Sequence, residues 1–215
     1  GGQVPLPKNY LKILYKKVRE NKGVCISDEV QTGFGRLGKY FWGFEMHDVI
    51  PDIVILGKPM GNGHPIGAVV TTAKIANSFE KGVEFFSSFG GNPVSCAVGL
   101  SVLNIIEEEG LQKNAKIVGN YYKNSLNSLK DKYKVIGDVR GQGLFLGIEI
   151  IHKKDKKPNA KLAKHIKNKL RDNHILVGTD GPYNNVIKTK PPICFTKKNV
   201  DQVIISLIKI LDRYK

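Results

Sequence analysis

The sequence predicts an α/β protein in which helices cover the strands of a sheet. Three short runs, at residues 24–27, 52–56 and 67–72, are apolar at nearly every position, which is typical of strands buried on both faces. Segments with the periodicity of helices lie between and after these runs, as an α/β design requires. With 215 residues, the chain is long enough for one domain or for two small ones.

The first half of the chain is predicted to contain two amphipathic helices around these strands. A helix over residues 8–22 ends at Gly23. A second helix is predicted over residues 92–108, because Pro93 stands near its start and Gly110 just beyond its end. The apolar positions that share one face of the first helix are Leu11, Leu14, Tyr15 and Val18.

The second half predicts an α+β arrangement with a core of its own. We place the boundary near residues 108–112, with one domain over residues 1–109 and a second over residues 110–215. The expected elements are a helix at 112–131, strands at 134–139 and 144–150, a helix at 159–172, a strand at 174–177, a turn at 180–182, a strand at 186–188 and a helix at 197–213.

The formal net charge of +15 raises the question of a nucleic-acid or membrane partner. The Lys residues are scattered along the chain, without a zinc-finger, basic-zipper or RNA-recognition pattern. No apolar run is long enough to cross a bilayer. We therefore expect a solvated, Lys-rich surface with no nucleic-acid and no membrane partner. A non-catalytic basic fragment that binds nucleic acid stays as a remote alternative.

Cysteine and histidine residues show no pattern of a metal site. The His residues have no metal-ligand spacing with the cysteines or with each other, so no metal is expected. The three cysteines are widely separated in apolar surroundings and are predicted to be buried, reduced side chains. They are Cys25, Cys96 and Cys194.

Two of the apolar runs lead into ionisable residues of opposite sign, Asp28 and Lys58. In open α/β sheets, ligands bind beyond the carboxyl ends of the strands. Gly-rich segments follow both residues, at 31–36 and 59–65, and a third at 87–93 leads into a helix, whose free N–H groups suit a phosphate. The sequence thus predicts a crevice with a carboxylate, an amine and a place for an anion.

The amine is the informative part of this pattern. A lysine in a mostly buried setting is held near neutrality and attacks carbonyl groups to form a Schiff base. A phosphate loop of the Walker type is excluded because Pro59 follows Lys58. Taken singly, Asp28 is better interpreted as a strand-end cap and Lys58 as a surface lysine. Their joint occurrence, 30 positions apart and with Gln31, favours a site.

Residues 27–38 (SDEVQTGFGRLG) and 57–63 (GKPMGNG) resemble the signature of class III aminotransferases, which are fold-type I enzymes dependent on pyridoxal 5′-phosphate (PLP). The likeness extends to the C-terminus. Residues 89–100, 179–182 and 185–195 are similar to the alanine–glyoxylate aminotransferase 2-like group, which includes ethanolamine-phosphate and 5-phosphohydroxy-L-lysine phospho-lyases. The resemblance implies part of the large PLP-binding domain, followed by the small C-terminal domain.

The resemblance also implies roles for individual residues. Asp28 would pair with the pyridine nitrogen, and Gln31 would lie near the ring hydroxyl. Lys58 would hold PLP as a Schiff base and then remove the proton beside the substrate nitrogen. Ser88 stands where the family usually has a Thr that reaches the cofactor phosphate of the neighbouring subunit. Lys188 stands where enzymes acting on α-amino acids commonly have an Arg that clamps the α-carboxylate.

These implied roles lead to two expected activities. The first is a phospho-lyase that eliminates phosphate and ammonia from phosphoethanolamine or 5-phosphohydroxy-L-lysine to give an aldehyde, because Lys188 cannot form the two-pronged contact of an Arg. The alternative is a true transaminase of the alanine–glyoxylate or ω-amino-acid type. Arg140 matches a family motif and is predicted to form a structural ion pair.

The resemblance further predicts a homodimer or a dimer of dimers, in mitochondria or, as the alternative, in the cytoplasm. A class III subunit is about twice as long as this chain, which opens without Met, so we expect a longer protein. Its other half would supply a phosphate cup and a ring-stacking aromatic residue. This chain alone is expected to fold poorly and to be inactive, because truncation leaves buried sheet edges unpaired.

Overall fold

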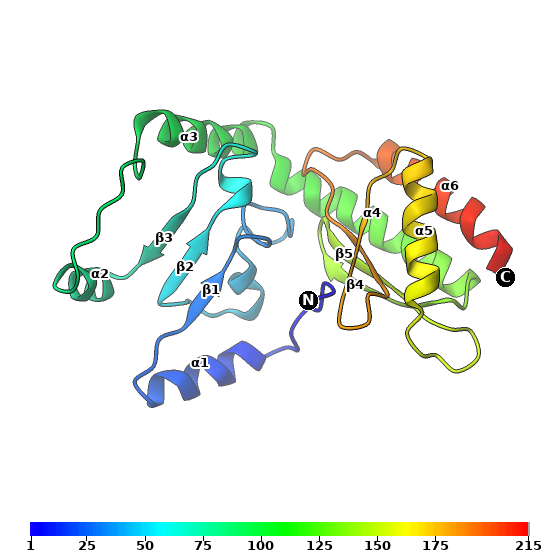
Figure 1. The fold of residues 1–215 in the computed structure, drawn as a ribbon, viewed down its shortest axis with the longest axis horizontal. Coiled ribbons are helices and arrows are strands. Elements are labelled where there is room, and N and C mark those ends of the chain that lie inside the picture. The colour runs from blue at the N-terminus through cyan, green and yellow to red at the C-terminus, as the bar shows by residue number, and fades with distance from the viewer. Residues whose placement is uncertain (215) are drawn as a thin grey trace. The chain divides into compact units, whose positions relative to one another are not determined.

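The structure, a computed structural model, describes residues 1–214 and divides into two compact units (Figure 1). The first unit holds Leu6–Gly35 and Tyr40–Leu111. The second holds Gly1–Pro5, Arg36–Lys39 and the residues from Gln112 on. The break after Leu111 lies near the boundary expected from the sequence, whereas two short segments of the N-terminal half belong to the second unit.

The first unit is built on a three-stranded sheet in the order β1-β2-β3. β1 and β2 are parallel, and β2 and β3 are antiparallel. Around the sheet lie three helices and two short 3-10 turns. In chain order the elements are α1 (Tyr10–Glu20), β1 (Ile26–Asp28), η1 (Gly43–His47), β2 (Ile53–Leu56), η2 (Lys58–Met60), β3 (Ala68–Thr71), α2 (Ala73–Glu80) and α3 (Pro93–Glu108).

The strands of the first sheet are less buried than the sequence predicted. Ile26 is 53 % exposed and Val69 66 % exposed. The expectation of burial on both faces is therefore wrong for the described residues, because α1, α2 and α3 cover only part of this sheet. The helices show the same incomplete cover, since Tyr15 is the one residue of α1 that is fully buried.

The second unit has a four-stranded antiparallel sheet in the order β4-β5-β7-β6. Side chains from its strands and from three helices form one continuous apolar core, with Leu126, Ile148 and Ile187 fully enclosed. The elements are α4 (Leu111–Lys132), β4 (Ile136–Gln142), β5 (Phe145–Ile150), α5 (Ala160–Asp172), β6 (Gly178–Asp180), β7 (Val186–Thr189), α6 (Lys197–Leu211) and η3 (Asp212–Tyr214).

Side-chain caps fix where three of the helices begin. Asn92, Asn159 and Thr196 each accept a hydrogen bond from the backbone N–H three residues further on. Such a cap satisfies one of the free N–H groups of the first helical turn. At α3, Pro93 takes the first helical position, where the missing N–H costs nothing.

The strand predicted at residues 174–177 is wrong, because the strand in this region is β6. The preceding helix α5 ends in a Schellman motif, in which His174 adopts a left-handed conformation with φ 61°. The Ile175 N–H then donates to the Leu170 carbonyl, at 2.9 Å. The backbone N–H groups at the start of the apolar run are used in this helix end. Strand pairing therefore begins only at Gly178.

Burial was predicted for all three cysteines and holds for only one. Cys25 is buried, whereas Cys96 and Cys194 are exposed. Cys96 lies on the part of α3 that also exposes Val94 and Leu100, by 67 % and 60 %. The described residues therefore do not cover the apolar side chains on this part of the helix. Cys194 lies in the loop before α6.

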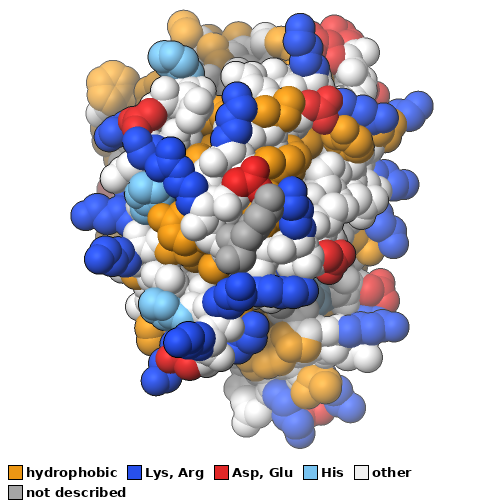
Figure 2. Space-filling model, turned by 90° about the vertical axis from the view of Figure 1, so that its right-hand side faces the viewer, with side chains coloured by type: hydrophobic (Ala, Val, Ile, Leu, Met, Phe, Trp, Pro, Cys, Tyr) orange, Lys and Arg blue, Asp and Glu red, His pale blue; other side chains and the backbone are white. Residues whose placement is uncertain are grey.

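Lys and Arg side chains are spread over the face shown in Figure 2, among acidic, His and apolar side chains. No helix within residues 1–214 combines the length and the apolar character needed to span a membrane. Over the same residues, no group of three or more His, Cys, Asp or Glu side chains is arranged to bind a metal ion.

Candidate cofactor site

Two neighbouring strand ends bring a carboxylate and an amine to one edge of the first sheet. β1 ends at Asp28, which pairs with Ile55 of the parallel strand β2. β2 ends one residue later, at Leu56, and Lys58 opens the turn η2. Neighbouring strands lie about 4.8 Å apart. Asp28 and Lys58 therefore lie at the same edge, at the carboxyl ends of two adjacent strands.

Asp28 also begins the loop that follows β1. Its Oδ1 accepts a hydrogen bond from the Val30 N–H at 3.0 Å, which turns the chain away from the sheet edge just before Gln31. Asp28, Gln31 and Lys58 are all exposed. The prediction of a mostly buried Lys58 is wrong for the described residues, because this lysine stands beyond the end of β2 in a turn that they leave uncovered.

The backbone at Lys58 is strained. Its φ of 33° lies in the left-handed region, which non-glycine residues rarely adopt and which costs about 1–3 kcal/mol. The turn is held by the Met60 N–H, which donates to the Gly57 carbonyl at 3.0 Å. Strain of this kind is concentrated at functional sites, where the surrounding structure maintains it.

A buried carboxylate that the sequence analysis did not single out organises the loop beside Asp28. Glu29 is 1 % exposed. Acceptance of several hydrogen bonds offsets the cost of burying its charge. Because two of its donors come from the start of η1, Glu29 joins the end of β1 to a segment 14 residues away. The donors are Thr32 Oγ1 at 2.7 Å, Gly43 N at 2.7 Å, Phe44 N at 2.9 Å and Ser27 Oγ at 3.0 Å.

The same loop requires a glycine where an aromatic ring approaches it. A Cβ at Gly33 would lie 2.8 Å from Cε3 of Trp42. Trp42 packs edge-on against Phe34 and Phe41, with ring centroids 5.3 and 4.7 Å away. The Gly-rich motif after Asp28 thus allows an aromatic cluster to close the loop.

Ser88 lies outside the sheet, in the loop that leads to α3. All residues from Lys81 to Gly91 are exposed. Within this loop the Gly90 N–H donates to Ser87 Oγ at 3.0 Å, just before the Asn92 cap. Ser88 therefore stands shortly before the N-terminus of a helix, as the sequence predicted for a phosphate-binding segment.

Lys188 belongs to the second unit, on strand β7. Its Nζ donates to Asp180 Oδ2 on β6 at 3.1 Å. The Gly181 N–H, and then Lys188, hold the pKa of the Asp180 carboxyl below its ordinary value. A Cβ at Gly178 would lie 2.8 Å from Lys188 Cε, so the lysine side chain lies along β6. Its ammonium group is thus engaged by a carboxylate of this chain.

Two arginines of the family motifs are structural in this chain. Arg140 pairs with Asp138 at 3.2 Å and with Glu149, which confirms the predicted structural ion pair. Arg36 donates to the carbonyl oxygens of Leu144 and Pro191, at 3.3 and 2.6 Å. Burial lowers the pKa of Arg36.

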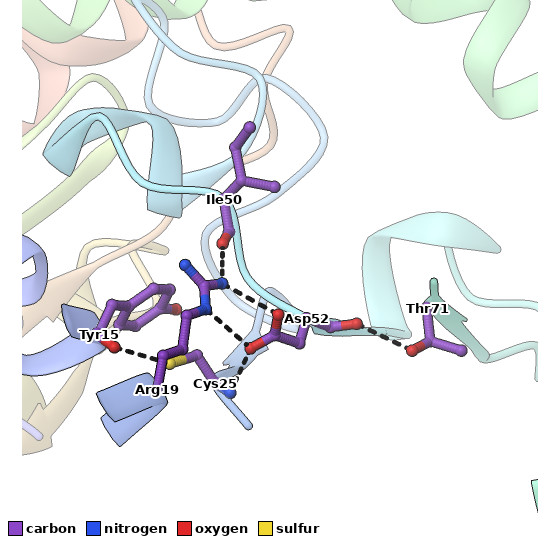
Figure 3. A network of polar contacts seen from close by, with 6 residues as sticks. All are labelled: Tyr15, Arg19, Cys25, Ile50, Asp52 and Thr71. Atoms are coloured by element: carbon purple, nitrogen blue, oxygen red, sulfur yellow. Dashed lines mark hydrogen bonds and ion pairs between the residues drawn. The ribbon is translucent and has the colours of Figure 1, made fainter. Parts of the chain in front are cut away.

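A polar network holds the opposite ends of β1 and β2, where both strands begin (Figure 3). Asp52 Oδ2 accepts from the Cys25 N–H at 2.7 Å, and Oδ1 pairs with Arg19 Nη2 of α1 at 3.1 Å. The carbonyl of Asp52 accepts from Thr71 Oγ1 at 2.8 Å. One residue therefore ties α1 and all three strands together, which fixes the sheet that carries Asp28 and Lys58.

Asp52→Ala is expected to destabilise the full-length protein by about 1–3 kcal/mol at pH 7, because the Cys25 N–H loses its acceptor and Arg19 loses its ion-pair partner. The Cys25 N–H, and then Arg19, lower the pKa of Asp52. Its stabilisation is therefore complete above the unfolded pKa of about 4 and is lost as the pH falls through the folded value. Unfolding by denaturant should show a difference from wild type that shrinks below about pH 4. Glu20→Gln on the exposed end of α1 is the control, and an equal effect of the two variants would contradict the assignment.

Comparison with known proteins assigns the chain to a family. The model of the family described as aminotransferase class-III matches residues 1–211. The chain belongs to the class III aminotransferase family. The resemblance found in the sequence is thereby confirmed, and so is the expected cofactor of the family, since its members depend on PLP.

Curated relatives in the family carry the name alanine–glyoxylate aminotransferase 2. The chain is 50 % identical over 214 residues to "Alanine--glyoxylate aminotransferase 2-like" of Drosophila melanogaster, covering 98 % of this chain and 43 % of that protein. It is 45 % identical over 204 residues to "Alanine--glyoxylate aminotransferase 2, mitochondrial" of Homo sapiens, covering 93 % of this chain and 39 % of that protein. The chain thus spans less than half the length of these relatives.

Similar solved structures confirm the fold class. A phospholyase from Arthrobacter in complex with phosphoethanolamine superposes with a TM-score of 0.96 at 42 % identity, covering 98 % of this chain and 50 % of that one. An S-selective transaminase from Arthrobacter sp. with alanine bound gives 0.88 at 30 % identity, covering 96 % and 47 %. The fold is that of fold-type I PLP-dependent enzymes.

The residues of the first unit fit the cofactor of this family. An amine and a carboxylate lie at the ends of adjacent strands, and the hydroxyl of Ser88 precedes a capped helix. These are the groups needed to bind an aldehyde, a ring nitrogen and a phosphate. The structure brings Asp28 and Lys58 to one sheet edge, with Gln31 in the adjoining loop. Lys188 belongs to the other unit.

Proposed function

We propose that the full-length protein is a PLP-dependent phospho-lyase. It would convert a phosphorylated amine, phosphoethanolamine or 5-phosphohydroxy-L-lysine, and water into an aldehyde, ammonia and inorganic phosphate. The observation that carries this proposal is Lys188, whose ammonium is bonded to Asp180 on the neighbouring strand.

Lys188 is unsuited to clamp a carboxylate beside the reacting carbon. An Arg at this position would offer two parallel N–H groups, whereas the ammonium of Lys is a single point charge. In this chain that charge is already neutralised by Asp180. A substrate whose reacting carbon lacks a carboxylate needs no carboxylate-binding residue at this position. The reacting carbon of phosphoethanolamine carries no carboxylate.

The comparisons also support a phospho-lyase. Both the sequence identity and the TM-score are higher for the phospholyase from Arthrobacter than for the S-selective transaminase. The two TM-scores, 0.96 and 0.88, both refer to superpositions over nearly the whole chain.

When bound, PLP would supply an electron sink for the carbon that bears the substrate nitrogen. Lys58 would hold the cofactor through its amine and would also be the base that takes the proton from that carbon. Asp28 would keep the ring nitrogen protonated through its negative charge, and Gln31 would lie near the ring hydroxyl. The Ser88 hydroxyl would donate a hydrogen bond to the cofactor phosphate of the neighbouring subunit.

The full-length protein is expected to release inorganic phosphate and ammonia from phosphoethanolamine or phosphohydroxylysine in equal amounts, without any oxo acid. Phosphate is measured by a colorimetric assay and ammonia by a coupled enzyme. A control with ethanolamine, which lacks the leaving group, should release neither product. Turnover that depends strictly on pyruvate or glyoxylate would refute the phospho-lyase.

The second candidate is a transaminase with the same PLP residues, which the names of the curated relatives favour. It would pass the amino group to an oxo acid and release no phosphate. The phosphate assay with and without glyoxylate separates the two activities directly.

We further propose a homodimer or a dimer of dimers, as the predicted reach of Ser88 into a neighbouring subunit requires. The loop around Ser88 exposes Phe85, Phe86 and Phe89 by 73–83 %, and such apolar area supports burial against a second copy. Relatives from Homo sapiens and Arabidopsis thaliana are named as mitochondrial, which supports that compartment for this protein.

A further inference from the structure

The turn that carries Lys58 contains two non-glycine residues in the left-handed backbone region. Lys58 and Asn62 have φ values of 33° and 45°. Backbone hydrogen bonds within the turn run from the Met60 N–H to the Gly57 carbonyl at 3.0 Å and from the Gly61 N–H to the Lys58 carbonyl at 3.4 Å. Strained residues persist only where the surrounding structure determines their conformation, so contacts from outside the turn also bear on the geometry of Lys58.

His64, at the end of this turn, provides a side-chain anchor. Its Nε2 lies 2.8 Å from Ser95 Oγ in the first turn of α3, and Ser95 is only 8 % exposed. The His64 N–H donates to the Gly61 carbonyl at 2.9 Å. The imidazole therefore joins the Lys58 turn to a helix that begins about 30 residues later in the chain.

Ser95 makes a second side-chain contact beside the one with His64. Its Oγ accepts from Asn92 Nδ2 at 2.9 Å, which leaves the hydroxyl proton and one lone pair for the ring nitrogen, in the direction set by the imidazole tautomer. Asn92 Nδ2 also donates to the carbonyl of Phe89 at 2.8 Å. This chain of contacts runs from the Lys58 turn to the residue next to Ser88.

A Ser–His pair also occurs in hydrolytic triads, but the arrangement here differs from one. In a triad, the third residue bonds the ring nitrogen that faces away from the serine. Here Asn92 bonds the serine itself, through both Oγ and the backbone N–H. The near-complete burial of Ser95 also keeps its oxygen from a substrate. The contacts thus suit a support and not a nucleophile.

We propose that His64 is a positioning residue that, through Ser95, holds the Lys58 turn and the Ser88 loop in one geometry. This inference rests on the proposed role of Lys58 as the cofactor-bearing residue. A misplaced amine reacts slowly even when binding is intact. Loss of the His64 contact should therefore act on the cofactor and on turnover without touching substrate contacts.

The test uses full-length holoenzyme with His64→Leu, which removes the hydrogen bond, and His64→Gln, whose amide group can replace Nε2 as either donor or acceptor. His64→Leu is expected to raise the PLP dissociation constant about tenfold, the effect of one such bond, and to lower kcat similarly with KM within about twofold. His64→Gln should restore most of both losses. Absorbance titration of the apoenzyme measures PLP affinity separately from activity.

Ser95→Ala removes the same contact from the other side and serves if His64→Leu does not fold. The double variant should be no worse than the single variants, because both remove one interaction. Ser101→Ala in the same helix, where the hydroxyl donates to the Ala97 carbonyl one turn earlier, is the matched control. Unchanged PLP affinity in His64→Leu, no rescue by Gln, or additive effects would overturn the inference. Failure of borohydride to attach PLP at Lys58 in wild type would instead refute the proposed site.

Discussion

Lys58→Ala in the full-length protein is expected to abolish covalent capture of PLP and to lower turnover by at least about 10³-fold, the contribution of a positioned general base. Ala accepts the left-handed φ of 33° no better than Lys does, so the strain of the turn is unchanged and the amine alone is lost. Borohydride reduction followed by peptide mapping should place the coenzyme on the peptide with Lys58 in wild type and nowhere in the variant.

Two further variants separate amine chemistry from charge. Lys58→Arg keeps the positive charge but stays protonated at all accessible pH values, so it should be as inactive as Lys58→Ala. Lys74→Ala removes an exposed lysine of α2 in the same unit and should leave activity unchanged. Attachment of the coenzyme to the same peptide in Lys58→Ala would overturn the assignment.

The elements that the sequence predicts well are those determined by local signals. The runs at 24–27, 52–56 and 67–72 correspond to β1, β2 and β3 within two residues, because apolar β-formers are bounded there by glycines and polar residues. The helices with side-chain caps, α3, α5 and α6, also begin within one residue of the expected position. A capping side chain bonds a backbone N–H three residues further on, so its residue type at the helix start can be recognised in the sequence.

Longer-range packing accounts for the failures. The apolar run after α5 belongs to the end of that helix and not to a strand, because His174 adopts a left-handed conformation there. No sequence rule predicts a Schellman motif at a histidine. Helix α2 was missed because it spans only eight residues, too few for its apolar periodicity to stand out in the sequence. Burial of Lys58 and Cys96 depends on what covers them, which local patterns do not contain.

The candidate site divides in the same way. Asp28 and Lys58 follow from apolar strands that end in ionisable residues, and the family signature adds Gln31 and Ser88. Glu29 and His64 were not recognised as organising residues, because their partners lie 14 and 31 residues away. A hydrogen bond across that separation leaves no periodicity in one sequence. The supporting contacts of a site are therefore harder to predict than its reactive groups.

Asp28→Ala is expected to lower turnover by about 10²–10³-fold while PLP still attaches to Lys58. The proposed role of the carboxylate is to stabilise positive charge on the ring nitrogen, and removal of one preorganised electrostatic contact has effects of this size. The backbone bond from Glu29 N to Ile55, at 2.9 Å, continues the pairing of β1 with β2 and does not involve the Asp28 side chain, so the sheet should persist.

The expected separation of binding from turnover makes Asp28→Ala informative. Asp28→Glu, which keeps the charge, should recover part of the rate, whereas Asp28→Asn should not. Glu20→Gln removes an exposed carboxylate from α1 and should be silent. Steady-state rates and the borohydride label are measured on the same preparations. If Asp28→Ala keeps wild-type turnover, the carboxylate beside Lys58 is only a strand-end cap, and the ring nitrogen must find its counter-charge elsewhere.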